Sequence, residues 1–501
     1  RSRWMDVILR MQGPDGLLYM PTRGRPWARV RLDKYDDLER TLAADHLTLP
    51  AECGCALGAL SLYALRDTSD VWRSVVERLV DALAARAIER EDYAYCPQAI
   101  FLPGEVTDPN AEMPGPFLGS FGGWVAVGLA QAYRALNYEP ALELAGKLCR
   151  HLKDHNNHFA PDGTFLPDRP LERPTAHFYH HAIGLQAMLE YGMLSGDQEM
   201  IDFAHRGFQY GMANGEMLTG YFPESIGSSR LQHSEICEVA TMIALGLKLT
   251  EAGVGDYLDD VDRWMRNMLV EMQLTPAKGD WLRRYSAGQP RSEVDPMGQT
   301  TERVIERNIG AFGGWPKAND WYEGVGNGIM HCCTGTGSRA LYYVWENILT
   351  CDSGKLQLNL LLNRASPWAD VDSHVPYVGQ VDVRIKELAE LSIRIPEWVE
   401  HDEVRLQLNG NDHPMDRDGR YAEVGEVKPG DVATMTFPIT ERTDEVWIEK
   451  EKFTLVRKGN DVVAIDPPGR LCPLYQRDHY RRDSTRWQKI ERFVSRERIY
   501  W

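Results

Sequence analysis

The chain has 501 residues, of which 43% are hydrophobic and 26% are charged, and its formal net charge is −17. This size predicts two domains, and this composition is typical of a folded soluble protein and not of a disordered one. No apolar run is long enough to span a membrane, and the negative charge would repel nucleic acid and anionic lipid. We therefore expect neither nucleic acid nor a membrane as a partner. The 14 Trp and 21 Tyr supply rings that can stack on sugars, although most rings in a protein are core.

The nine cysteines are an odd number without regular spacing, which predicts reduced thiols and a cytoplasmic location. The sequence begins at Arg1 with neither Met nor an apolar export segment, so a signal removed by processing is compatible with it. A homodimer is one assembly that the sequence allows.

An internal repeat of helices occupies the N-terminal part of the chain. Four segments open with polar or small residues near Cys55, Gly119, His177 and Glu235, and the steps between these starts are 64, 58 and 58 residues. Each segment is apolar for about four turns, breaks at a short turn and resumes as an amphipathic helix. A fifth apolar helix follows a long insertion at about residues 273–330.

The two helices of each repeat differ in their pattern. The first is apolar nearly all round and the second has a polar face, as the inner and outer rings of a helical toroid require. We therefore predict an (α/α)6 barrel over residues 1–350. The sixth hairpin, which would close the ring, has to come from the stretch between Trp4 and Gln12.

The hydrophobic period changes from about Cys351 onwards, from 3.6 towards 2. Short segments of this kind are separated by turn residues such as Asn409-Gly410 and Pro429-Gly430. We predict a β-sandwich over residues 351–501. Its last thirty residues are rich in Arg and Tyr and show no clear pattern.

The starts of the inner helices carry most of the chemistry-bearing side chains. Inner helices of a toroid enter from one of two rims, so equivalent starts of successive repeats converge in space. The residues at these starts are Glu52 to Cys55, Ser120 to Trp124, His177 with His180 and His181, Glu235 with Cys237, and His331 with Cys332 and Cys333. Helix N-termini carry partial positive charge that stabilises thiolates. We therefore expect the functional site at this rim.

Three thiols and one carboxylate, from Cys237, Cys332, Cys333 and Glu235, form the donor set of a tetrahedral zinc site. Soft sulfur donors favour zinc over calcium or magnesium. At spacing i, i+2, Glu235 and Cys237 reach one ion only where the segment is extended or just entering its helix. The adjacent cysteines need similar freedom, which a turn at residues 334–337 could supply. Spacing alone also allows buried structural cysteines.

The Glu-x-Cys from Glu235 to Cys237, followed much later by Cys332-Cys333, resembles glycoside hydrolase family 127, the β-L-arabinofuranosidase-type enzymes. The similarity runs over roughly residues 45–465. Its further motifs are His181-Ala182-Ile183, Ile226-Gly227-Ser228-Ser229, Leu391 to Trp398 and Leu408-Asn409-Gly410.

The resemblance implies a retaining exo-glycosidase that hydrolyses a terminal glycoside, with β-L-arabinofuranoside as the substrate of the family. It assigns Cys332 as the zinc-bound nucleophile and His181 as a sugar-binding histidine. The further zinc ligands that it implies are Glu235, Cys237 and Cys333. Zinc would keep Cys332 as a thiolate that can attack the anomeric carbon, and water would then hydrolyse the thioglycosyl intermediate.

Two departures from the family pattern bear on this chemistry. Thr334-Gly335-Thr336 follows the cysteine pair where the family has Pro-Pro-Asn, and the Gly-Glu with the acid/base glutamate is absent. We favour Glu224 as the substitute proton donor, because desolvation beside Tyr221 and Phe222 would raise its pKa; a solvated loop carboxylate is the alternative. The other candidates are His233, Glu52 and Glu302.

Trp124 and His177 are the remaining expected sugar contacts, with core packing as the alternative for Trp124. Other functions stay open. In a toroid polysaccharide lyase or sugar epimerase, His177, Tyr179 and His180 would transfer protons without a metal. A non-catalytic carbohydrate-binding relative is compatible with the missing glutamate. A purely structural zinc site predicts that Cys332→Ala unfolds the protein.

Overall fold

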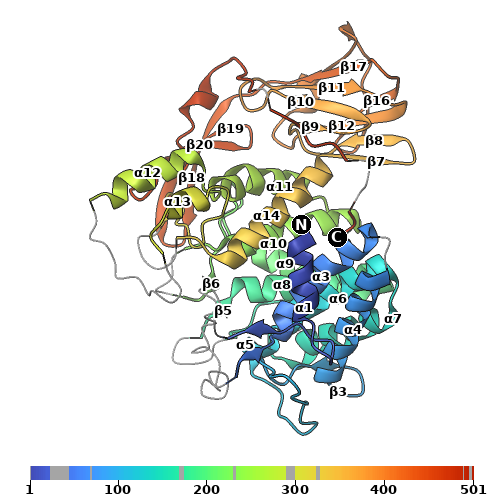
Figure 1. The fold of residues 1–501 in the computed structure, drawn as a ribbon. Helices are drawn as coiled ribbons and strands as arrows, with labels where there is room; N and C mark the ends of the chain where they lie inside the picture. The colour runs from blue at the N-terminus through green and yellow to red at the C-terminus, as the bar shows by residue number, and fades with distance from the viewer. Residues whose placement is uncertain are drawn as a thin grey trace.

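The computed structural model describes residues 2–22, 44–67, 70–168, 174–228, 233–288, 300–322, 328–488, 490–495 and 499–501. Helices predominate up to Ile348 and strands predominate from Leu349 onwards. The strand-rich part lies on top of the helical part in Figure 1. Among the described residues, none of the helices combines the length and the hydropathy needed to cross a bilayer.

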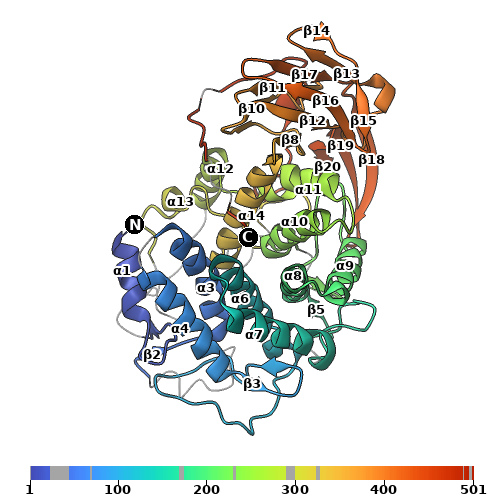
Figure 2. The same ribbon diagram turned by 90° about the vertical axis from the view of Figure 1, so that its right-hand side faces the viewer.

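Five inner helices follow one another around the described helical part, and each packs against the next along the chain. They are α3 (Pro50–Arg66), α6 (Gly122–Leu136), α8 (Phe178–Ser195), α10 (Ile236–Glu251) and α14 (His331–Ile348). Figure 2 shows this succession. The sequence placed repeat starts at His177 and Glu235, and these two residues are the N-caps of α8 and α10.

The second helix of each repeat packs on the outside of the first. These outer helices are α4 (Asp70–Arg86) on α3, α7 (Glu139–Arg150) on α6, α9 (Gln198–Ala213) on α8 and α11 (Leu258–Trp264) on α10. Two of them continue as single π-helical turns, η2 (His151–His155) and η3 (Met265–Leu269). The alternation of inner and outer helices therefore follows the repeat seen in the sequence.

Burial explains why the two kinds of helix differ in composition. Every residue of α10 from Ile236 to Leu249 is buried, because the helix is covered by neighbours on all sides. The outer helix α9 buries one face, which includes Met200, Phe203 and Phe208. An inner helix therefore needs apolar residues all round, whereas an outer helix needs a single apolar stripe.

Helices α3 and α6 cross in backbone contact. A Cβ atom on Gly54 would lie 2.6 Å from the carbonyl oxygen of Trp124, and one on Gly128 would lie 2.1 Å from the carbonyl oxygen of Gly54. Only glycine allows this approach at both positions.

The stretch expected to supply the sixth hairpin forms one helix, α1 (Ser2–Met11), and not a hairpin. Its end is tied to the outer helix α4, since Gln12 Nε2 donates to the Val75 carbonyl at 2.9 Å and Arg78 donates to the Gly13 carbonyl at 2.9 Å. Residues 23–43, which separate α1 from the first inner helix, lie outside the described part.

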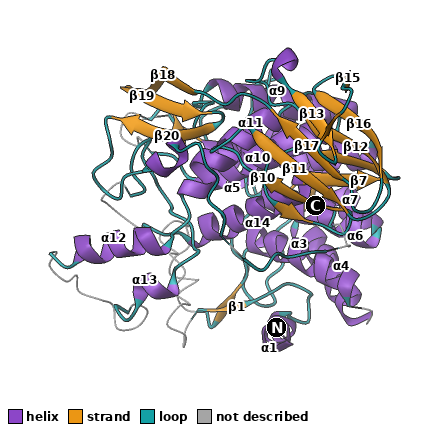
Figure 3. Cartoon of the chain, turned by 90° about the horizontal axis from the view of Figure 1, so that it is seen from above, coloured by secondary structure: helices purple, strands orange, loops and turns teal. Residues whose placement is uncertain are grey.

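Short elements connect the repeats. They are the pairs β1 (Met20–Pro21) with β2 (His46–Leu47), β3 (Ile88–Glu89) with β4 (Ala94–Tyr95) and β5 (Ala176–His177) with β6 (Ser225–Ile226), and the turn of helix α5 (Pro116–Gly119). The insertion before α14 carries α12 (Pro276–Ser286) and α13 (Val304–Arg307), which project from the helical part in Figures 1 and 3.

Two sheets form the β-sandwich. The six-stranded sheet has the order β14 (Asn411–Asp412), β13 (Arg405–Leu408), β17 (Val432–Thr436), β11 (Gln380–Ile385), β10 (Ala369–Ser373), β9 (Arg364–Ala365). The five-stranded sheet has the order β15 (Asp416–Asp418), β16 (Tyr421–Val427), β12 (Ala389–Arg394), β8 (Lys355–Leu358), β7 (Leu349–Asp352). Strands β8 and β12 are parallel, and the other pairs are antiparallel.

The alternating pattern of these strands matches their burial. Val381 and Val383 of β11 are buried and lie opposite Met435 and Ala433 of β17, which are also buried. Such cross-strand apolar pairs form one face of the sandwich core. A one-residue slip would turn each of these side chains to solvent.

A third, three-stranded sheet joins the sandwich to the helices: β18 (Glu441–Ile448), β19 (Glu451–Lys458) and β20 (Asp461–Asp466). Two short 3-10 helices, η4 (His401–Glu403) and η5 (Asp478–Arg481), complete this part. The chain then returns to the helices, where Gln131 Nε2 donates to the Tyr500 carbonyl at 3.1 Å and Trp501 stacks on Tyr343 of α14.

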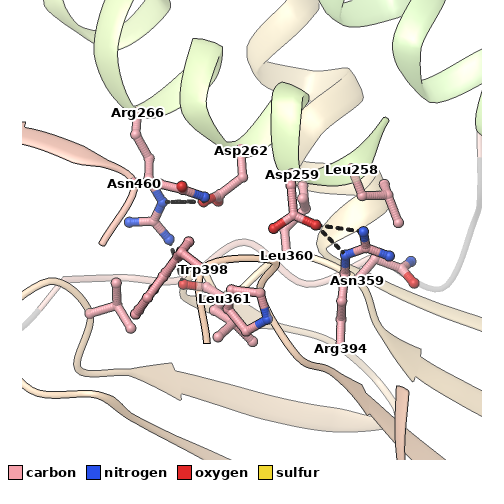
Figure 4. Close-up of a pocket in the computed structure, with 12 residues that line it drawn as sticks. Leu258, Asp259, Asp262, Arg266, Asn359, Leu360, Leu361, Arg394, Trp398 and Asn460 are labelled. Atoms are coloured by element: carbon pink, nitrogen blue, oxygen red, sulfur yellow. Dashed lines mark hydrogen bonds and ion pairs between the residues drawn. The ribbon is translucent and has the colours of Figure 1, made fainter. Parts of the chain in front are cut away.

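Buried ion pairs hold the two parts together at the junction shown in Figure 4. Arg394 of β12 donates to Asp259 of α11 at 2.6 Å. Arg266 of η3 binds Asp262 at 2.8 Å and the Leu361 carbonyl at 2.8 Å. Because Arg394, Asp259 and Arg266 are buried, their pairing is needed to offset the loss of hydration.

Candidate active site

The N-terminal ends of α10 and α14 bring four of the predicted residues together. The Sγ atoms of Cys237 and Cys333 are 3.6 Å apart, and those of Cys332 and Cys333 are 3.9 Å apart. Glu235 Oε1 lies 3.4 Å from the sulfur of Cys333 and 3.8 Å from that of Cys332. One ligand atom from each residue lies within 4.8 Å of all the others. The four residues that the sequence analysis grouped as one site therefore lie together.

These distances suit a tetrahedral ion. Two sulfurs bound at the usual Zn–S length of ~2.3 Å stand ~3.8 Å apart, and a sulfur and a carboxylate oxygen stand ~3.5 Å apart. The observed S–S distances of 3.6 and 3.9 Å and O–S distances of 3.4 and 3.8 Å lie on either side of these values. The same separations are far too long for a disulfide, and the three cysteines are free thiols.

The cluster concentrates acidic groups in a buried place. Burial, followed by the charge of Cys332, raises the pKa of Glu235 to about 8. Burial also raises the pKa of Cys237 well above its usual range. Hydrogen bonds from Cys237 and Cys333 lower the pKa of Cys332, which makes it the first thiol to ionise. Glu235 Oε2 is buried and has no hydrogen-bond partner among the residues that the structure describes. This donor set could hold a cation, whose positive charge would allow several of these groups to be ionised in one place.

Local structure explains how residues two apart can reach one point. Glu235 is the N-cap of α10, with extended φ and ψ of −125° and 137°. Its carboxylate therefore does not follow the helical spacing to Cys237, which lies in the first turn. The Glu235 N–H donates to Glu238 Oε1 at 2.6 Å, in a capping box that holds the N-cap residue in place.

The cysteine pair occupies the first turn of α14, where Thr336 Oγ1 donates to Cys237 Sγ at 3.3 Å. The flexible turn expected at residues 334–337 is wrong, because these residues are helical. Cys332 and Cys333 instead reach the cluster from adjacent positions of one helical turn. Cys332 is half-buried and the other three donors are buried, so Cys332 is the accessible member of the set.

A second group of acidic and imidazole side chains adjoins the cluster. The β5–β6 pair places His177 opposite Ser225, next to Glu224. His177 Nε2 lies 3.6 Å from Glu224 Oε1 and 3.8 Å from Glu235 Oε2. His233 Nε2 lies 2.5 Å from Glu224 Oε2. Glu224 is therefore held between two imidazoles beside the thiol cluster, with 12% of its side chain exposed.

Aromatic rings surround the second group. Trp124 packs edge-to-face against Tyr179 and His180, with ring centres 5.3 and 5.1 Å apart, and it is half-buried. His180 in turn lies 4.5 Å from His177, centre to centre. The Nδ1 atom of His180 meets Ser120 Oγ at 2.8 Å. Trp124 and His177 therefore lie where the sequence placed sugar contacts, at the starts of neighbouring inner helices.

His181 lies elsewhere. Its side chain is fully buried and its ring stacks on His158 at 3.7 Å. Its two nitrogens meet the carbonyl oxygens of His177 and Leu166 at 2.8 and 2.9 Å. The structure thus gives His181 a packing position in the core behind His177, with no surface to offer a sugar.

The other proton-donor candidates are spread around the same region. His233 is buried and bonded to Glu224. Glu52 is exposed in the first turn of α3, and Glu302 is exposed in the loop before α13. Of these four side chains, Glu224 is the carboxylate that shares a contact network with the thiol cluster.

Sequence reasoning missed two supporting residues, Glu238 and Thr336. Glu238 sits three residues after Glu235, so the pattern Glu-x-x-Glu before an apolar run was a visible capping signal. Thr336 lies four residues after Cys332 and therefore on the same face of α14. This could be recognised only after the structure showed that residues 334–337 are helical.

Comparisons with known proteins bear on the family resemblance and on the fold. The model of the β-L-arabinofuranosidase GH127 middle domain matches residues 352–439. No curated protein sequence matches the chain.

Solved structures match over most of the chain. The GH127 β-arabinofuranosidase BT3674 superimposes with a TM-score of 0.60 and 14% identity, covering 92% of this chain and 71% of that one. A GH127 β-L-arabinofuranosidase from Geobacillus stearothermophilus T6 gives 0.53 and 15%, covering 92% and 72%. A third, described as a glycoside hydrolase, gives 0.58 and 14%, covering 92% and 73%. The predicted resemblance to family 127 and the predicted fold, a helical toroid followed by a β-sandwich, are therefore confirmed.

Proposed function

We propose that the chain is a retaining exo-glycosidase that removes a terminal sugar from an oligosaccharide or glycoside. The observation that carries the proposal is the meeting of Glu235, Cys237, Cys332 and Cys333 at one point, with Cys332 alone half-exposed. The fold shared with GH127 enzymes supports the reaction class. β-L-Arabinofuranoside is the first substrate to test, because the resemblance to family 127 suggests it.

We assign zinc to the four donors, since three soft sulfurs and one carboxylate match its preferences. Bound zinc would supply positive charge that keeps thiols ionised at neutral pH. Glu235, Cys237 and Cys333 would hold the ion from the buried side. Cys332 would complete the set while keeping its sulfur open to a sugar.

In the first half of the proposed reaction, the Cys332 sulfur attacks the anomeric carbon and the bond from that carbon to the leaving oxygen breaks. Glu224 donates its proton to that oxygen. In the second half, water attacks the anomeric carbon, the carbon–sulfur bond breaks and Glu224 takes back a proton from the water. The two inversions leave the anomeric configuration unchanged.

Glu224 suits the acid/base role because of its neighbours. It lies 3.6 Å from His177 and is bonded to His233, and His177 in turn lies 3.8 Å from Glu235 of the thiol cluster. His177 lies beside it, Trp124 packs on His180 next to His177, and both His177 and Trp124 would contact the sugar ring. Trp124 offers a flat face, and His177 offers a polar nitrogen near Glu235.

Two alternatives predict different outcomes. A lyase or epimerase would use Tyr179, His177 and His180 for proton transfer and would work without bound metal. A non-catalytic carbohydrate-binding relative would bind sugars and turn over none. Neither alternative accounts for the geometry of the thiol cluster.

The test combines metal analysis of purified protein with a panel of nitrophenyl glycosides, for wild type and Cys332→Ser. We expect about one zinc per chain and hydrolysis of at least one glycoside, lost at least about a thousandfold in the variant because its nucleophile is gone. Retention of the melting temperature by Cys332→Ala separates a catalytic site from a purely structural one. Undiminished turnover by Cys332→Ser would overturn the mechanism.

A further inference from the structure

One half-buried arginine of the barrel differs from the buried arginines of the chain in its partners. Six arginines are buried, and each has a carboxylate partner. These pairs are Arg86 with Asp15, Arg263 with Asp260, Arg266 with Asp262, Arg364 with Glu346, Arg394 with Asp259 and Arg477 with Glu271. Among the described residues, Arg339 has neither a hydrogen bond nor an ion pair.

Arg339 lies on the face of α14 that carries the active-site residues. It is seven residues after Cys332 and three after Thr336, so all three project from the same side of the helix. Thr336 meets Cys237 of α10 across this side. Four residues further on, Tyr343 lies beneath the Arg339 guanidinium, 5.8 Å from it.

The surroundings of the guanidinium place it inside the ring. Its strongest electrostatic neighbours are Tyr343, Tyr179 of α8, Cys55 of α3 and Cys237 of α10, which come from four different inner helices. None of these groups is a carboxylate. Arg339 is half-buried, so it is withdrawn from bulk water and yet still reachable.

Tyr179 links this cation to the thiol cluster. Its electrostatic neighbours include Cys237 and Glu235 on one side and Arg339 and Cys55 on the other. Along α14, the rise from Cys332 to Arg339 is ~10 Å, and a helical side chain leans back towards the N-terminus of its helix. The guanidinium therefore interacts electrostatically with Cys237 of the thiol cluster and with Tyr179 beside it.

We propose that Arg339 receives a carboxylate of the substrate, so that the terminal sugar cleaved at Cys332 is an acidic sugar of the uronic acid type. This rests on the proposed glycosidase function. A withdrawn guanidinium without an anion is costly, and a carboxylate matches its planar fork with two parallel hydrogen bonds. The Tyr179 hydroxyl adjoins the same place. Because the chain as a whole carries a charge of −17, an acidic sugar needs such a local cation.

Binding of free sugars tests the proposal without turnover. D-Glucuronate and D-galacturonate are titrated against D-glucose and D-galactose by calorimetry, using wild type, Arg339→Gln, Arg339→Lys and the exposed β15 control Arg417→Gln. We expect the acids to bind about tenfold to a hundredfold more tightly than the neutral sugars. Arg339→Gln should abolish that preference, Arg339→Lys should keep part of it, and Arg417→Gln should match wild type.

Equal binding of acids and neutral sugars by wild type, absence of binding by both acids, or a preference that survives Arg339→Gln would overturn the proposal. Arg339→Lys retains the charge, so it guards against a glutamine variant that fails to fold. Hydrolysis separates this inference from the function on which it rests. If hydrolysis depends on Cys332 but favours neutral glycosides, the acidic-sugar proposal is wrong and the proposed glycosidase function is retained. If acidic sugars bind through Arg339 but no glycoside is hydrolysed, the binding site is retained and the proposed glycosidase function is wrong.

Discussion

Replacing Glu238 by Ala removes the acceptor of the Glu235 N–H, a hydrogen bond of 2.6 Å in a place where Glu238 has no exposed surface. The N–H then stays buried without a partner, which costs about 1–3 kcal/mol. Glu238→Gln is the matched control. Burial raises the pKa of Glu238 well above its usual range, which favours the neutral acid, and the amide oxygen of Gln can accept the same hydrogen bond.

The larger effect should appear in metal affinity. Glu238 does not belong to the donor set, but it orients Glu235, which does. Loss of such an outer contact typically weakens metal binding about tenfold to a hundredfold. Chelator competition followed by atomic absorption measures this for wild type, Glu238→Ala and Glu238→Gln. We expect the alanine variant to lose zinc at lower chelator concentration and the glutamine variant to stay close to wild type.

Two results would refute the reasoning. If Glu238→Ala held its metal as tightly as wild type, the capping box would not position Glu235. If both variants lost metal equally, the carboxyl group itself would matter, and the hydrogen bond that it accepts from the Glu235 N–H would not explain the effect. Circular dichroism of all three proteins confirms that the helices remain.

Three further predictions concern the core, the junction and the rim. Burial lowers the pKa of His181 to about 4 and that of His158 well below its usual range, so the unfolded chain binds more protons than the folded one; stability should be complete above about pH 6.5 and fall towards pH 4, by up to about 3 kcal/mol for His181, in urea titrations at a series of pH values. Arg394→Ala leaves buried Asp259 without its cation, with the Glu397 N–H as its remaining donor, and should lower the free energy of unfolding by about 3–5 kcal/mol, measured by urea denaturation; a loss below about 1 kcal/mol would contradict the role of this pair. Trp124→Ala should raise the KM of any hydrolysed glycoside about tenfold, with zinc content unchanged, whereas a merely structural ring would lower the melting temperature and leave the KM of the folded enzyme alone.

The periodicity of the sequence predicts the arrangement of the helices. Residues such as His177 and Glu235 mark N-caps because the change from polar to apolar residues is a local signal, and successive N-caps at similar steps meet at one rim. The convergence of Cys237 with Cys332 follows from that topology, although 95 residues separate them. This is why the meeting of these cysteines could be predicted without any contact information.

Other features depended on packing that no local pattern encodes. His181 and His177 both lie near the start of α8, and only the three-dimensional path shows that one faces the core and the other faces Glu224. The single helix α1 and the stacking of Trp501 on Tyr343 involve contacts between distant segments. Arg339 has no hydrogen bond or ion pair with the described residues. This too depends on which side chains lie near it in space, and the sequence alone does not show that.

Glu235 divides its carboxylate between two neighbours, with Oε1 towards the sulfurs and Oε2 towards His177. An enzyme stripped of its ion would thereby also lose the fixed rotamer beside that imidazole, so its affinity for sugar should fall together with its metal loading. In a purification buffer that contains a chelator, the measured affinity for sugar would then be low because metal had been lost, and a good substrate could be mistaken for a poor one. If the proposed ion is bound, kinetic constants for this chain are best normalised to the moles of metal recovered in each preparation.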